Sequence, residues 1–127
     1  LSTRAARAAL PPSVAHGDAA VNLGRMALLV AGLADHRRLA PEAAHDRLHQ
    51  PYRAALFPES SALIDGLVSA GALCACWSGA GPSILAVCTS ASAPAVQSAG
   101  EALLRGLAVP GRCLQVAADT AGLVVAG

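Results

Sequence analysis

The sequence contains no lysine, and all nine of its basic residues are arginine. This absence excludes a phosphate-loop lysine and a Schiff-base lysine within these residues. Aromatic residues make up only 2% of the chain, so its core must be built from Ala, Leu and Val, whose small side chains favour closely packed helices. The formal charge is only +1 with both signs mixed along the chain, and we therefore expect neither nucleic acid nor an anionic membrane surface as a partner.

Charged residues are also missing between Gly66 and Gly100. A membrane-spanning helix needs about 20 predominantly apolar residues in a row. Gly79, Gly81 and Pro82 interrupt this stretch near its middle, so a buried hairpin explains it better than a membrane span.

Zinc-knuckle spacing is absent as well. Cys74 and Cys76 are two residues apart, which is not the C-x-x-C spacing of a zinc knuckle, and the four histidines show no H-x-H pattern. We therefore expect no metal site and reduced thiols in a cytoplasmic protein. The chain begins with Leu1 rather than methionine, and we expect it to be part of a longer protein.

Apolar periodicity predicts a mostly helical first half, followed by strands that alternate with helices. The sequence predicts helices over 3–10, 15–34, 41–50, 60–71 and 93–107, and strands over 73–77, 84–88, 112–117 and 122–126. Residues 51–59 are expected to form an irregular connection with a proline on each side. This order predicts a single α+β domain over residues 1–127, with an antiparallel or mixed sheet and helices packed on one face.

The strand predicted over 84–88 is apolar on both alternating faces. A sheet that is wetted on one side alternates apolar with polar residues. Either helices of this chain or a neighbouring domain must therefore cover the second face.

The segment SGAGPS, Ser78 to Ser83, joins the two apolar runs. Glycines without side chains let exposed backbone N–H groups approach an anion, so one interpretation is a phosphate contact. The other is a tight connection between strands. A Walker A loop is excluded because no Lys-Ser/Thr pair follows the second glycine, and a nucleophile elbow is excluded because Cys76 and Ala80 occupy its glycine positions.

Two further segments carry candidate binding residues. In LSTRAAR, Thr3 and Arg7 are four apart and share one helix face, where Thr3 either caps the helix or contacts a ligand. In HQPYR, Arg53 follows a proline that stiffens the chain. A guanidinium held in place binds carboxylate or phosphate through two parallel hydrogen bonds, so Arg53 is either an anion clamp or a surface residue.

The order of four segments, LSTRAAR, AHGDAAVNLGRMALL, DRLHQPYR and WSGAGPSILAV, resembles the C-terminal half of the homoserine kinase family. That family belongs to the small-molecule kinase superfamily with galactokinase and mevalonate kinase, and the resemblance extends from Leu1 to about Val87. It implies a ferredoxin-like C-terminal domain of a cytoplasmic enzyme that transfers the γ-phosphoryl of Mg-ATP to the hydroxyl of L-homoserine, in threonine biosynthesis.

The resemblance also implies roles for individual residues. Arg7 and Arg53 would bind the carboxylate of the substrate, and Thr3 would lie near the phosphoryl group. The loop residues Ser78, Gly79, Ala80 and Gly81 would support the nucleotide phosphates. Phosphoryl transfer depends chiefly on positioning and charge neutralisation, which two arginines and a bare loop can supply.

The family's ATP-binding glycine-serine loop and the acidic residue that serves Mg²⁺ do not occur in these residues. The resemblance places both in an N-terminal domain, so we expect the 127 residues alone to be inactive and the doubly apolar strands to mark where that domain packs. A homodimer is left open. Two alternatives also remain: a kinase of the same superfamily with another small alcohol as substrate, and a non-catalytic α+β module that binds an amino acid.

Overall fold

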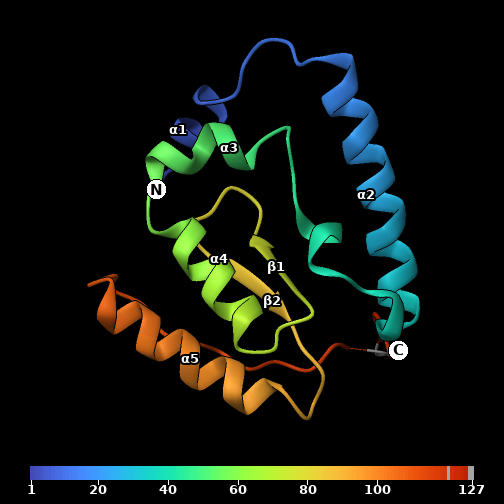
Figure 1. The fold of residues 1–127 in the computed structure, drawn as a ribbon, viewed down its shortest axis with the longest axis vertical. Helices are drawn as coiled ribbons and strands as arrows, with labels where there is room; N and C mark the ends of the chain where they lie inside the picture. The colour runs from blue at the N-terminus through green and yellow to red at the C-terminus, as the bar shows by residue number, and fades with distance from the viewer. Residues whose placement is uncertain (120, 126–127) are drawn as a thin grey trace.

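The computed structural model describes residues 1–119 and 121–125, in which helices surround one β-hairpin (Figure 1). The α-helices are α1 (Thr3–Ala8), α2 (His16–Ala34), α3 (Gln50–Arg53), α4 (Ser60–Ser69) and α5 (Ala93–Gly106). Three 3₁₀ helices are η1 (His36–Arg38), η2 (Pro41–Ala44) and η3 (Ala54–Leu56).

The sheet of the described residues is an antiparallel pair, β1 (Cys74–Trp77) and β2 (Ile84–Val87). Its register places Cys74 opposite Val87 and Trp77 opposite Ile84, so the glycine loop is the bend of the hairpin. Helix α4 ends before Gly71, whose φ of 108° lies in the left-handed region that favours glycine. The α+β class and both of these strands are confirmed.

The strands predicted over 112–117 and 122–126 are not formed among the described residues, and position 126 lies outside them. The segment 109–113 instead runs along α5, where Cys113 lies against Gly100. The side chains of Leu114 and Val116 are 68% and 80% exposed, so the apolar pattern that predicted a strand has no neighbouring surface to pack on. A strand needs an edge to pair with as well as a suitable pattern, and these residues do not reach the hairpin ladder.

The helix predicted over 41–50 is also wrong. Residues Pro41–Ala44 form only the short η2, and α3 starts at Gln50 with Pro51 in its first turn. Proline lacks an N–H that the first helical turn does not use, so Pro51 begins a helix here rather than ending one. Arg53 is consequently the last residue of a helix, and not part of an irregular connection.

The two faces of the hairpin are covered by different helices. On one face, Ala75 packs with Leu67 of α4 and Val96 of α5. On the other face, Cys74 packs with Leu39 and with Ala43 of η2. Helices of this chain therefore contribute to covering both faces, which is one of the two alternatives that the sequence left open for the second face.

Helix α2 lies apart from the hairpin along most of its length (Figure 1). Its contact with the rest of the chain includes Gly32, which is buried against Leu39. Four apolar side chains at helical spacing, the α2 stripe, are 57–75% exposed: Leu23, Met26, Val30 and Leu33. Within the described residues, α2 is the one helix long and apolar enough to cross a membrane by length and composition, a test that core helices also pass.

Candidate functional site

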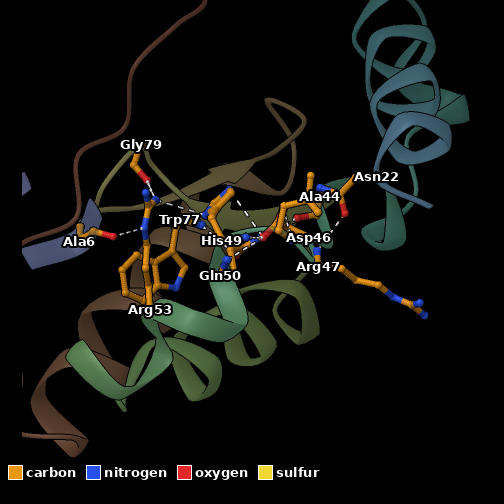
Figure 2. A network of polar contacts seen from close by, with 11 residues as sticks. Ala6, Asn22, Ala44, Asp46, Arg47, His49, Gln50, Arg53, Trp77 and Gly79 are labelled. Carbon is orange, nitrogen blue, oxygen red and sulfur yellow. Dashed lines mark hydrogen bonds and ion pairs between the residues drawn. The ribbon is translucent and has the colours of Figure 1, made fainter. Parts of the chain in front are cut away.

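Three segments that are distant in sequence meet at the guanidinium of Arg53 (Figure 2). Its Nε donates to the carbonyl oxygen of Ala6 in α1 at 3.1 Å, and its Nη1 donates to the carbonyl oxygen of Gly79 at 3.1 Å. Nη1 also lies 3.3 Å from Nδ1 of His49. Arg53 is only 9% exposed, so these contacts fix α1, α3 and the glycine loop relative to one another.

Helix α1, which carries Thr3 and Arg7, joins this junction through the carbonyl of Ala6. Ser2, and not Thr3, caps the helix: its side chain accepts from the backbone N–H of Ala5 at 3.1 Å. The capping interpretation of Thr3 is therefore wrong, and Thr3 is exposed in the first turn. The carbonyl of Ala6 belongs to the last turn of α1, where helix carbonyls lack helical partners and attract cations, which explains its bond to Arg53.

Arg7 directly follows the residue that Arg53 binds, and its side chain is exposed. The structure thus brings Arg53 to the part of α1 that carries Arg7, although 46 positions separate them in the sequence. The assignment of both arginines to a substrate carboxylate stays a prediction.

The glycine loop is shaped by contacts that only glycine permits. Gly79 and Gly81 have φ values of 59° and 75°. A Cβ on Gly81 would lie 2.5 Å from the Trp77 ring, which itself packs edge to face on Phe57 with 6.0 Å between ring centroids. The loop closes with a bond from the Ser78 N–H to the Ser83 carbonyl at 2.8 Å. Any side chain at position 81 would displace Trp77 or the loop.

The bend is accessible, since Ser78 and Gly79 are exposed and Ala80 and Gly81 are partly exposed. In the part of the chain that the structure describes, the N–H groups of Gly79 and Ala80 donate no hydrogen bond. The N–H and C=O of one trans peptide point in opposite directions. By holding the Gly79 carbonyl, Arg53 therefore turns the Ala80 N–H away from itself and fixes its direction.

The charge of Arg53 is not neutralised by an acid. Among residues 1–119 and 121–125, no carboxylate oxygen lies within 4.0 Å of its guanidinium, and its three contacts are two carbonyls and an imidazole. A buried cation that is held by dipoles alone remains attractive to an anion. The site therefore offers a positioned positive charge beside an accessible glycine loop.

Sequence reasoning missed the roles of Asp46 and His49, which lie to one side of Arg53 with His49 the nearer (Figure 2). Burial acts to raise the pKa of Asp46, but the hydrogen bonds that its carboxylate accepts outweigh burial and lower the pKa. Burial lowers the pKa of His49, and the Arg53 charge adds to this against the opposing effect of Asp46. The signal in the sequence was an aspartate a few residues before Gln-Pro, a pattern typical of a capped turn that leads into a helix.

The described residues contain no group of three or more His, Cys, Asp or Glu side chains arranged to hold a metal ion. All four cysteines are free thiols, and burial raises the pKa of Cys74, Cys76, Cys88 and Cys113.

The family described as GHMP kinases C terminal matches residues 26–105. This match covers the second half of α2, then α3, α4, the hairpin with its glycine loop, and nearly all of α5. The chain belongs to the GHMP kinase C-terminal family.

The similar proteins described next are all homoserine kinases, two of them compared by sequence and one by structure. A homoserine kinase from Synechococcus is 43% identical over 96% of this chain, and one from Streptomyces avermitilis is 51% identical over 78% of it. The crystal structure of homoserine kinase from Cytophaga hutchinsonii aligns with a TM-score of 0.75 and 28% identity, over 84% of this chain and 35% of that one. The chain spans 39% and 32% of the lengths of the first two relatives.

Proposed function

We propose that these residues form the C-terminal half of a homoserine kinase, the half that binds the amino-acid substrate and supports the phosphates. The similar chains named homoserine kinase support this proposal. The observation that carries it is the buried Arg53, which is held beside the glycine loop by two carbonyls and an imidazole, with no carboxylate of the described residues within 4.0 Å.

In this function Arg53 and Arg7 bind the carboxylate of L-homoserine from α3 and α1. The substrate hydroxyl attacks the γ-phosphorus of ATP, a new O–P bond forms, the bond to the β-phosphate oxygen breaks, and the hydroxyl proton is released. Thr3 lies near the phosphoryl group, and the N–H groups of Gly79 and Ala80 donate to phosphate oxygens. The protein supplies position and positive charge rather than a covalent intermediate.

The nucleotide and its metal need residues beyond this chain. The described residues contain no group of three or more His, Cys, Asp or Glu side chains arranged to hold a metal ion, and we place the Mg²⁺ ligands in an N-terminal domain of a longer chain. Mg²⁺ bound there would neutralise the charge of the ATP phosphates.

We further propose that the α2 stripe and Leu85 of β2, which is 49% exposed, are covered by that N-terminal domain. Burial of a large apolar side chain contributes about 1.5–3 kcal/mol, so this surface favours a stable contact. We place the enzyme in the cytoplasm, and a homodimer is compatible with the remaining exposed surface.

The test is release of ADP in the presence of ATP, Mg²⁺ and L-homoserine. We expect activity from a longer chain that carries an N-terminal domain and none from the 127 residues alone. Activity of the 127 residues would overturn the assignment of the ATP site, and a longer chain that phosphorylates another small alcohol but not homoserine would overturn the substrate. Tight amino-acid binding by the short chain without any kinase activity of the longer one would indicate a binding module instead.

A further inference from the structure

The carboxylate of Asp46 closes the turn that leads into α3. Its Oδ2 accepts the backbone N–H groups of His49 and Gln50, each at 2.6 Å. Its Oδ1 accepts the backbone N–H of Leu48 at 3.0 Å and the side-chain amide of Asn22, in α2, at 2.6 Å. The side chain of Asp46 is 8% exposed, so this carboxylate fixes where α3 begins and how His49 is placed.

His49 lies between Asp46 and Arg53 (Figure 2). Its Nδ1 is 3.3 Å from Nη1 of Arg53, and its Nε2 is 3.8 Å from Oδ2 of Asp46. A guanidinium has donors and no acceptor, so Nδ1 must accept this hydrogen bond. The proton of the neutral ring is then on Nε2, on the side of the carboxylate, which favours the same tautomer.

The imidazole completes the set of acceptors that orient Arg53. The two hydrogens of Nη1 go to the Gly79 carbonyl and to His49, while the hydrogen of Nε goes to the Ala6 carbonyl. Within residues 1–119 and 121–125, Nη2 donates to no protein atom. Three acceptors on two of its nitrogens therefore fix the plane of the guanidinium and leave the third nitrogen for a ligand.

We propose that His49 is a positioning residue for the substrate carboxylate: it accepts a hydrogen bond from Arg53 through Nδ1, Asp46 holds it in the Nε2–H tautomer, and Nη2 of Arg53 thereby faces the substrate. This inference rests on the proposed function. The lowered pKa of His49 agrees with it, because a protonated ring would turn a donor and a second positive charge toward Arg53.

The kinetic test compares two substitutions in an active longer chain. Asn in place of His49 keeps an acceptor near the Nδ1 position, whereas Gln carries its polar atoms near the Nε2 position. We expect His49→Gln to raise the KM for L-homoserine about tenfold, the effect of losing one hydrogen bond to a charged group, with kcat and the KM for ATP changed less than about twofold. His49→Asn should recover most of that loss. His36→Gln, at an exposed histidine in η1, is the control.

Equal KM values for the Asn and Gln variants, or a parallel loss of kcat in both, would overturn the positioning role. A second measurement, which needs no enzyme activity, tests the positioning role of His49 separately from the proposed function. The imidazole ¹⁵N shifts of His49 in the 127-residue chain should show the Nε2–H tautomer at neutral pH, and Asp46→Asn should reduce its population. A predominant Nδ1–H tautomer would refute the geometry even if the longer chain is a kinase. Absence of homoserine phosphorylation by the unmodified longer chain would refute the proposed function while the ¹⁵N result stands.

Discussion

The junction at Arg53 and the outer side of α2 differ in how completely other residues of this chain bury and contact them. Arg53 is 9% exposed and hydrogen-bonded to two other segments, whereas Leu23 and Leu33 in the α2 stripe are 75% and 63% exposed. Contacts within this chain thus hold Arg53 in place, while the described residues leave the α2 stripe uncovered. Under the proposed function, the junction binds the substrate and a further domain covers the α2 stripe.

The largest expected effect comes from breaking the junction. Arg53→Ala leaves the carbonyls of Ala6 and Gly79 without their charged donor, and we expect the free energy of unfolding of the 127-residue chain to fall by about 2–4 kcal/mol. Denaturant titration measures this change. The exposed Arg112 provides the matched control, and Arg112→Ala should change stability by less than about 0.5 kcal/mol. A similar small change for Arg53→Ala would show that the junction does not hold the segments together.

A smaller effect on stability is expected from substitutions at two glycines of α2, Gly32 and Gly24. A Cβ on Gly32 would lie 2.8 Å from the backbone Cα of Leu39, whereas a Cβ on Gly24 meets nothing within 4 Å. We expect Gly32→Ala to destabilise the chain by about 1–3 kcal/mol and Gly24→Ala to stabilise it by roughly 0.5–1 kcal/mol. Thermal unfolding of both variants measures the difference. Two changes of the same sign would contradict the described placement of α2.

The smallest expected effect is a change in how stability depends on pH, caused by Asp46. The lowered pKa of Asp46 means that its ionised form contributes stability, which is fully present above the ordinary aspartate pKa and is lost as the pH falls through the lowered folded value. Asp46→Asn should therefore be less stable than the natural chain near neutral pH, with a difference that shrinks below about pH 4. Unfolding measured across this range tests the sign. The exposed Asp65, changed to Asn, is the control, and a difference for Asp46→Asn that grows in acid would contradict the assignment.

Local patterns in the sequence predicted the parts of the fold that depend on local physics. Helix α2, the two strands and the bend at Gly79 and Gly81 follow from apolar periodicity and from glycine conformation. Pro51 was misread because a proline permits the start of a helix as well as its end, and the choice is made by Asp46, which caps that turn. The strand predicted over 112–117 failed because pairing depends on an available edge, which no local pattern encodes.

The candidate site was predictable in its residue types and only partly in its geometry. Arg53 stood out through its motif, but its bonds to Ala6 and Gly79 span 47 and 26 positions, and periodicity carries no information at that range. The bond between Asp46 and Asn22 likewise spans 24 positions. His49 was considered only as a metal ligand, because its contact with Arg53 depends on an α3 that the sequence did not predict.

The most direct measurement is the KM for L-homoserine of a longer, active chain with Arg53 changed to Ala. Loss of a buried charged partner typically costs about 2–5 kcal/mol, so a rise of at least roughly thirtyfold relative to the unmodified enzyme is predicted, with Arg112→Ala unchanged. An unchanged KM for homoserine in a folded Arg53→Ala enzyme would contradict the claim that this guanidinium binds the substrate carboxylate.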